Sequence, residues 1–245
     1  MPIERLFDVD PAPPQELYDS VRFPPSPPAR PHVYMNTVTT VDGKTLIGPR
    51  GSTARGLGSQ TDQILMRRLE QAADGIIVGA GTLRAGPVIY PPEKWRIAVS
   101  RSGSVDTTNR FFTDAPGRAI ILVTEATPQE ERDRLARSAA VRVVGRDAVD
   151  VAAALVLLRS ELGIERLLLE GGADLNAAFI EARVVDEVFL TVAPKVKGGA
   201  DLPTMVDGAG LPGYEVLALE LQSIYREDSE LYLRYRARPD RETRS

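Results

Sequence analysis

The sequence predicts an α/β protein built on a mixed, mostly parallel central sheet with helices on both faces. From residue 32 onward, short apolar runs rich in β-branched residues alternate with segments of helical apolar spacing, as in parallel strands joined by covering helices. The last segment, 214–238, shows period-two alternation broken at 227–229, which indicates an antiparallel hairpin. We therefore expect the parallel sheet to end in a C-terminal antiparallel hairpin.

Each element is predicted from its own pattern. Seven strands are expected before the hairpin, each short and bounded by glycine or polar residues: 32–40, 75–79, 95–100, 118–124, 141–144, 165–170 and 186–193. Four helices are expected: 60–73, 128–138, 149–162 and 173–183. In the third helix, apolar residues share one face: Val151, Leu155, Leu158 and Leu162. In the hairpin Leu231, Leu233 and Tyr235 share one face.

Residues 1–31 form a proline-rich N-terminal arm in front of one main domain, residues 32–245. The arm holds nine of the 19 prolines, a composition that favours extended segments over a packed element. Its apolar residues could anchor it: Leu6, Phe7, Leu17, Tyr18 and Phe23. The arm is expected to wrap its own domain or a partner subunit, or else to be a loosely attached tail. The polar segment after Arg238 is expected to fray.

Composition excludes several classes of partner. With 30 Lys and Arg against 34 Asp and Glu, the chain has no positive field to attract nucleic acid. Its longest apolar runs fall far short of the ~20 residues that a membrane span needs. The acidic N-terminus, with Glu4, Asp8 and Asp10, does not resemble a signal peptide, so the cytoplasm is expected.

The chain contains no cysteine and one histidine, His32. Disulfides, thiolate nucleophiles and cysteine-bound zinc are therefore excluded, and no metal site is expected. His32 is interpreted as a structural residue at the start of a strand. Covalent and metal-assisted catalysis have few possible carriers here, whereas hydride transfer needs only a bound cofactor, a positioned substrate and exclusion of water.

Two strand-to-helix turns are rich in glycine, at 78–82 (VGAGT) and 169–173 (LEGGA). Glycine lets phosphate oxygens approach the N–H groups at a helix start, where the helix dipole favours an anion. Each turn alone could be a simple tight turn. Together, after two strands of one sheet, they lie at its carboxyl edge, where ligands of open α/β sheets bind.

The strand 95–100 ends at Ser100 and is followed by Arg101. At this place a site for NAD would usually have an acid that holds a ribose hydroxyl. A hydroxyl and a guanidinium suit a 2′-phosphate, which favours NADP over NAD, although a solvated surface arginine is the simpler alternative. Asp42, Gly43 and Lys44 imitate the end of a P-loop, but Val38 stands where its first glycine must be.

Two carboxylates at predicted strand ends are the candidate catalytic groups. Asp42 follows a β-branched run and Glu170 ends another strand. Either could orient an amide-like ring edge or pass a proton to the atom beside the one that receives hydride. The alternatives are a turn residue for Asp42 and a carboxylate that caps helix N–H groups for Glu170.

Four motifs, in order, resemble the riboflavin-biosynthesis pyrimidine reductase family over about residues 32–236: 40–44 (TVDGK), 78–82 (VGAGT), 169–172 (LEGG) and 190–199 (LTVAPKVKGG). The resemblance implies a dihydrofolate-reductase-like fold, a homodimer, and use of NADPH to reduce the ribosyl group of an aminopyrimidine phosphate to ribityl. Residues 32–245 would be the reductase domain. Bifunctional members also carry a zinc deaminase domain, for which this sequence has no cysteines.

The resemblance also implies site residues. Thr82, Ser100 and the turn 171–175 would bind NADPH, and Glu170 would face the substrate beside the nicotinamide. With the residues of the first glycine turn and Arg101 argued above, the full cofactor set is Thr39, Gly79, Gly81, Thr82, Ser100, Arg101, Gly171, Gly172, Ala173, Asp174 and Leu175. The substrate set is Asn36, Thr40, Asp42, Arg67 and Glu170.

The sequence departs from the family pattern at three positions. Typical members have a lysine where Asn36 stands and an arginine where Glu70 stands, and Gly86 occupies a position that is often Asp. Arg67 or Arg68 could supply the charge lost at Glu70. The departures keep two alternatives open: a dihydrofolate or pterin reductase-like enzyme, and a non-catalytic NADPH-binding regulatory module.

Overall fold

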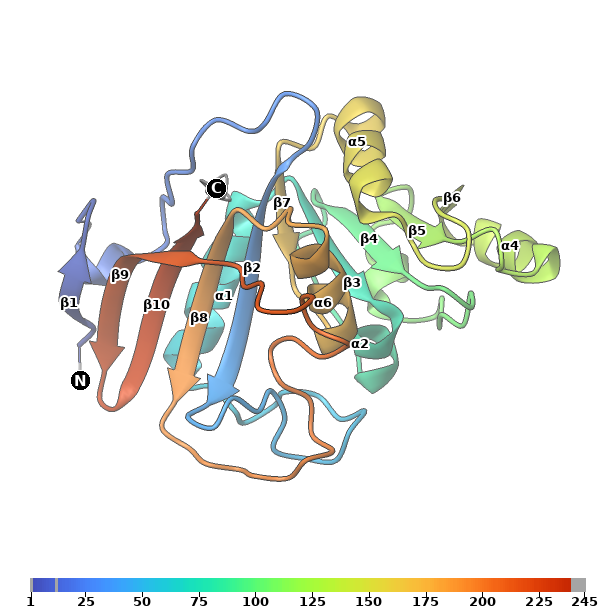
Figure 1. The fold of residues 1–245 in the computed structure, drawn as a ribbon. Helices are drawn as coiled ribbons and strands as arrows, with labels where there is room; N and C mark the ends of the chain where they lie inside the picture. Colours follow the sequence, from blue (N-terminus) through green and yellow to red (C-terminus); the bar gives the residue numbers. More distant parts are fainter. Residues whose placement is uncertain (1, 12, 239–245) are drawn as a thin grey trace.

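The computed structural model describes residues 2–11 and 13–238. Ten strands form one sheet in the order β1-β9-β10-β8-β2-β7-β3-β4-β5-β6 (Figure 1). All pairings from β8 to β6 along that order are parallel, and those among β8, β10, β9 and β1 are antiparallel. The predicted mixed sheet with an antiparallel C-terminal hairpin is confirmed. The fraying predicted after Arg238 lies outside the described residues.

The strands are β1 (Glu4–Asp8), β2 (His32–Thr40), β3 (Gly75–Gly79), β4 (Trp95–Val99), β5 (Ala119–Val123), β6 (Ala140–Val143), β7 (Arg166–Leu169), β8 (Glu187–Ala193), β9 (Leu219–Glu227) and β10 (Glu230–Ala237). The helices are α1 (Gln60–Ala72), α2 (Ala80–Ala85), α3 (Arg110–Thr113), α4 (Gln129–Ala136), α5 (Val151–Leu162) and α6 (Ala173–Glu181), with a 3₁₀ turn at Pro14–Glu16. The elements predicted from the sequence are all present. β1, α2, α3 and the 3₁₀ turn were not predicted.

Helices cover both faces of the sheet because successive strand residues point to opposite sides. On β3, Ile76 and Val78 pack into a core with α1, α2, α3 and α4, whereas Ile77 between them packs against α5 and α6. Strands that are buried on both faces read as continuous apolar runs, which is why GIIVG and AIILV contain almost no polar residue.

The N-terminal arm lies against its own domain. Leu17 and Tyr18 are buried in the α1-side core, and the Phe23 ring lies 4.6 Å from the ring of Tyr34. β1 pairs antiparallel with β9 and forms one edge of the sheet. Two of the expected anchor residues are not buried: Leu6 is 50% exposed and Phe7 is 43% exposed.

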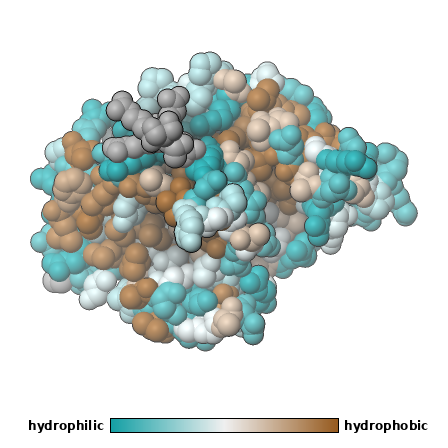
Figure 2. Space-filling view, viewed as in Figure 1, coloured by the Kyte–Doolittle hydropathy of each residue, from teal (hydrophilic) through white to brown (hydrophobic). Residues whose placement is uncertain are grey.

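One part of the sheet has no helix over it. α5 and α6 stand over the parallel strands, and the neighbouring β8, β10 and β9 have no helix on that face (Figure 1). Most of the residues that point out of this uncovered face are apolar and half-buried: Leu190, Val192, Ile224, Leu231, Leu233 and Tyr235. The exposed Arg226, which pairs with Leu231, lies on the same face. Figure 2 shows hydrophobic side chains gathered on the left of the same view, where these strands lie.

None of the described helices is long and apolar enough to cross a membrane.

Candidate active site

The two glycine turns lie side by side at the carboxyl edge of the sheet. β7 and β3 are parallel neighbours, so the segments that follow them emerge together. The Gly79 amide donates to the Gly171 carbonyl at 2.9 Å, and the Thr82 hydroxyl donates to the same oxygen at 3.3 Å. The structure thus brings together both segments that the sequence assigns to a cofactor.

The second turn is a cradle that only glycine forms easily. Gly171 and Gly172 have φ angles of +61° and +84°, which side chains rarely adopt. α6 then begins at Ala173 without a side-chain cap, so its first N–H groups are left for water or a ligand. An anionic cofactor group fits this position, where the helix dipole adds to the N–H groups.

Two other predicted residues of this turn differ in what they can offer a ligand. The Asp174 side chain is exposed on the first turn of α6, where its charge would oppose a nearby anion. The Leu175 side chain is buried among core residues, so only its backbone N–H is available to a cofactor. Gly81 lies exposed in the first turn of α2, where a Cβ would meet only the Arg84 guanidinium, at 3.9 Å.

Ser100 and Arg101 follow β4, the strand next to β3. Ser100 is 4% exposed, and its amide donates to the Leu122 carbonyl. The Arg101 carbonyl accepts hydrogen bonds from Thr124 and Thr127, while its side chain is exposed. Because β4 lies one strand beyond the glycine turns, an extended ligand along this edge could reach both places.

Asp42 closes a turn at the end of β2. Its carboxylate accepts hydrogen bonds from the amides of Lys197 and Gly198, at 3.0 and 2.6 Å. The Thr40 hydroxyl accepts from the Lys44 amide at 2.8 Å in the same turn. Hydrogen bonds, first that of Thr40 and then those of the two amides, lower the Asp42 pKa to about 2. Asp42 is therefore a fully ionised, exposed carboxylate that ties the turn 40–44 to the segment after β8.

Thr39, the neighbour of Thr40, is 6% exposed and pairs with Val192 of β8, on the sheet face opposite to Asn36.

Glu170 lies on the α1 side of the edge, beside β2. Its Oε2 accepts a hydrogen bond from the Tyr90 hydroxyl at 2.8 Å, while Oε1 is buried and has no hydrogen-bond partner in the described chain. Asn36, on the neighbouring strand, interacts with the same carboxyl. Burial, followed by the nearby charge of Glu70, raises the Glu170 pKa to about 8. The carboxyl does not cap α6, so the capping alternative does not hold.

Glu70 faces inward from α1 and is only 1% exposed. Arg67, one turn earlier, donates to both its carboxylate oxygens, at 2.8 and 3.0 Å. Arg68 points away, with its guanidinium bound to Asp19 and to the Leu17 carbonyl of the arm. Of the two arginines considered as substitutes for a family cation, only Arg67 lies beside the site.

Tyr90 is a site residue that the sequence analysis missed. It belongs to the loop 86–94, between α2 and β4, and its side chain is 5% exposed. Arg67 donates to the Ile89 carbonyl at 2.9 Å, and the fully buried Arg96 donates to the Tyr90 carbonyl at 2.8 Å. A tyrosine followed by two prolines reads as an ordinary loop residue, and only the fold reveals its partner.

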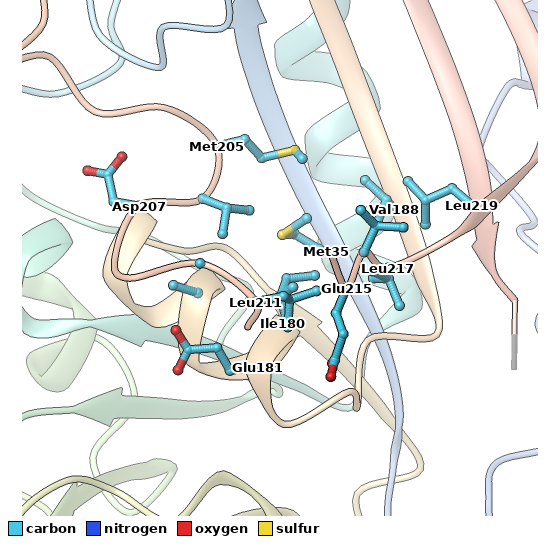
Figure 3. A pocket seen from close by; sticks show the side chains of 14 residues that line it. Met35, Ile180, Glu181, Val188, Met205, Asp207, Leu211, Glu215, Leu217 and Leu219 are labelled. Atoms are coloured by element: carbon cyan, nitrogen blue, oxygen red, sulfur yellow. The ribbon is translucent and has the colours of Figure 1, made fainter. Parts of the chain in front are cut away.

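A separate cavity of about 290 Å³ lies on the other face of the sheet, beneath the segment 205–219 (Figure 3). Its lining is mainly apolar, with Met35, Ile180, Val188, Met205, Leu211, Leu217 and Leu219, and its polar side chains are the acids Glu181, Asp207 and Glu215. Apolar walls with acidic side chains do not suit a polyphosphate, and the cavity contains neither glycine turn.

Among the residues that the structure describes, no three His, Asp or Glu side chains lie close enough together to hold a metal ion.

Comparison with known proteins gives consistent matches. A family model described as the RibD C-terminal domain matches residues 31–233. The chain is 32% identical over 222 residues to a 2,5-diamino-6-ribosylamino-4(3H)-pyrimidinone 5′-phosphate reductase of Methanothermobacter thermautotrophicus, covering 84% of this chain and 98% of the relative. A protein of the same name from Aquifex aeolicus is 32% identical over 213 residues, covering 82% of this chain and 94% of the relative.

Solved structures support the same fold. A pyrimidine reductase-like protein of Corynebacterium diphtheriae superposes with a TM-score of 0.72 at 22% identity, covering 86% of this chain and 93% of that one. The yeast riboflavin biosynthesis reductase Rib7 superposes with a TM-score of 0.60 at 17% identity, covering 86% and 91%.

Proposed function

The chain belongs to the RibD C-terminal domain family and is an oxidoreductase, and from this premise we propose that it uses NADPH to reduce the ribosyl group of an aminopyrimidine phosphate. The observation that carries the proposal is the contact of the two glycine turns directly beside the buried carboxyl of Glu170. The proposed site for an anionic cofactor would thus lie beside a group that can hold a proton, at one edge of the sheet.

NADPH supplies the hydride. The turn 171–175 and Thr82 would hold its phosphates through backbone N–H groups and a hydroxyl, which need no positive side chain. Ser100 and the exposed Arg101 would take a 2′-phosphate, the feature that distinguishes NADPH from NADH. The preference for NADPH rests on this pair.

Glu170 is the better candidate of the two acids for supplying the proton that accompanies hydride. Its pKa is raised to about 8 by burial, so the carboxyl holds a proton at neutral pH. Asp42, with a pKa lowered to about 2, holds none and makes its hydrogen bonds to backbone amides. Asp42 would shape the pocket by fixing the turn 40–44.

The names of the relatives support a ribosylaminopyrimidine phosphate as substrate. Asn36, Thr40 and Glu170 would line the pocket for it. Arg67 is the cation of this region, but its guanidinium is engaged by Glu70. The substrate phosphate must therefore compete for Arg67 or bind at another cation.

We also propose that the protein is a homodimer. The uncovered apolar face of β8, β10 and β9 supports this, because a folded monomer rarely exposes a contiguous apolar patch of this kind (Figure 2). The cytoplasm remains the predicted compartment.

The deciding experiment follows NADPH oxidation by absorbance with the purified protein. The substrates are the diaminopyrimidinone ribosyl phosphate, its deaminated uracil counterpart and dihydrofolate, with NADH as the alternative cofactor. Turnover of either pyrimidine supports the proposal. The pyrimidine that is reduced faster shows whether reduction comes before or after deamination. Turnover of dihydrofolate alone would indicate the pterin alternative. NADPH binding, measured by fluorescence, without consumption would indicate the regulatory module.

A further inference from the structure

The α1 side of the sheet's carboxyl edge holds two buried carboxyls and one cation. Glu70 is 1% exposed, and both of its carboxylate oxygens accept hydrogen bonds from the Arg67 guanidinium. Glu170 accepts a hydrogen bond from the neutral Tyr90 hydroxyl, and its Oε1 is buried without a hydrogen bond in the described chain. If both acids were ionised, one negative charge would stay uncompensated away from water, which is costly.

A proton on one of the acids removes this excess charge. Glu70 is the acid that has the guanidinium, at 2.8 and 3.0 Å, so its ionised form is the better stabilised. Glu170 has only neutral groups in direct contact. The proton therefore belongs on Glu170.

We propose that Glu170 is a neutral carboxylic acid in the resting enzyme, that the charge of Glu70 keeps it neutral, and that Tyr90 is the residue that positions its carboxyl group. Tyr90 donates to Oε2, which assigns the proton to Oε1. A neutral acid offers one donor and one acceptor, whereas a carboxylate only accepts. For the reaction proposed above, the inference specifies a substrate that presents a lone pair to this oxygen, such as a ring nitrogen or a carbonyl oxygen.

The groups around Glu170 act on its protonation in both directions, and those that favour the neutral acid have the larger effect. Burial first, and then the charge of Glu70 of α1, raise the pKa of Glu170, whereas Tyr90, Arg67 and Asn36 lower it, and the resulting pKa is about 8. Tyr34 of β2 also faces this region, and burial raises its pKa well above the usual value, so it stays neutral.

Tyr90 is held firmly enough to position an acid. The Arg96 side chain, 0% exposed, donates to the Tyr90 carbonyl, and Asn109 accepts a hydrogen bond from the Val88 amide in the same loop. These contacts fix the backbone of the loop that carries the Tyr90 hydroxyl.

The test is infrared spectroscopy of the full chain across pH, without substrate. The carbonyl stretch of the protonated carboxyl, assigned by its loss in Glu170→Gln, should be present at pH 7 and disappear with a midpoint near 8. Tyr90→Phe should move the midpoint up by about one pH unit, because the carboxylate loses a donor. Glu70→Gln should move it down by a similar amount, because a like charge is removed.

Tyr232→Phe is the matched control. Tyr232 also donates to a buried carboxylate, Glu230, at 2.8 Å, and lies outside the site. Its replacement should leave the Glu170 midpoint unchanged. If Glu70→Gln does not fold, the variant lacking both Glu70 and Arg67 charges, E70Q/R67Q, should still lower the midpoint, since the Glu70 effect is the larger.

Absence of the protonated band at pH 7, or midpoints that do not move in opposite directions, would overturn the inference. Because no substrate is present, this result does not depend on the proposed reaction. Where the pyrimidine is turned over, the alkaline limb of kcat should shift in the same two directions, with KM for NADPH unaffected. A limb that stays in place in both variants would also contradict the positioning roles.

Discussion

Gly171 combines two properties that can be separated experimentally. It has a φ of +61°, and a Cβ at this position would come within 3.1 Å of the Asn176 amide oxygen. Gly163, which ends α5 just before β7, has nearly the same φ of +65° but open space around a Cβ. Both substitutions therefore carry backbone strain, and only one disturbs the cradle.

We expect Gly171→Ala to weaken NADPH binding by about tenfold or more, whereas Gly163→Ala leaves it unchanged. Both should lower the free energy of unfolding by about 1–2 kcal/mol, because alanine resists the left-handed region. Fluorescence titration with NADPH and urea denaturation give the two quantities. Equal NADPH affinity in both variants would show that the turn at Gly171 does not hold the cofactor.

Because Glu170 and Asp42 differ in environment, replacing each carboxylate by the matching side-chain amide should affect catalysis differently. Glu170→Gln should lower kcat by about 10²-fold or more while leaving the NADPH dissociation constant within about twofold. Asp42→Asn replaces one of the two oxygens that accept from backbone amides by an NH2 group, which cannot accept. It should therefore loosen the turn 40–44 and alter KM more than kcat. Steady-state kinetics with the ribosylaminopyrimidine phosphate measures both. Full activity in Glu170→Gln would remove Glu170 from proton supply.

At the scale of elements, α1 carries both site residues Arg67 and Glu70, and its start is tied to the sheet. Ser59 caps it by accepting from the Asp62 amide at 3.1 Å, and its hydroxyl donates to Glu230, which is 6% exposed. The Ser59 amide also donates to Glu230, at 3.1 Å. The hairpin of β9 and β10 thus holds the helix that carries Arg67 and Glu70.

Ser59→Ala should lower the free energy of unfolding by about 2 kcal/mol, because it removes a cap and also a donor to a buried carboxylate. Asp150→Ala is the comparison, since Asp150 caps α5 with one bond to the Ala153 amide on an exposed surface. That variant should cost about 1 kcal/mol. Chemical denaturation compares them. A larger loss for Asp150→Ala would mean that Glu230 contributes nothing to the start of α1.

The elements that the sequence predicted are those with a repeating apolar pattern. The apolar runs GIIVG of β3 and AIILV of β5 predict strands that are buried on both faces. The spacing of Val151, Leu155 and Leu158 predicts the helix α5. β1, α2 and α3 were missed because they are short, and a six-residue helix or an exposed edge strand leaves no periodic signal.

For the site, glycine spacing predicted the two turns, because positive φ angles and close approach leave a mark in the sequence. The Tyr90 contact left none, since it joins residues 80 positions apart and depends on the path of a proline-containing loop. From the sequence, Glu70 is recognisable only as a departure from a family pattern. Its burial with Arg67 follows from which side of α1 faces the sheet.

The whole molecule is asymmetric in how its sheet is covered. Helices cover the parallel strands on both faces, whereas β8, β10 and β9 have the arm and α1 on one face and no helix on the other (Figure 1). Leu233 lies in the middle of this uncovered face, opposite Leu190 on one side and Ile224 on the other. A second copy of the chain would remove these side chains from water, at about 25 cal/mol for each Å² buried.

We therefore expect light scattering to give the mass of a dimer, and Leu233→Arg to give a monomer, because burying an unpaired guanidinium in an apolar interface costs several kcal/mol. Val156→Arg is the control, since Val156 is 50% exposed on α5, away from the uncovered face, and an arginine there stays in water. A dimer that persists in Leu233→Arg would place the interface elsewhere, and a monomeric unmodified protein would contradict the homodimer itself. If the monomer also keeps NADPH binding and turnover, each site is complete within one chain, as the contacts of Glu170 with Tyr90 of the same chain lead us to expect.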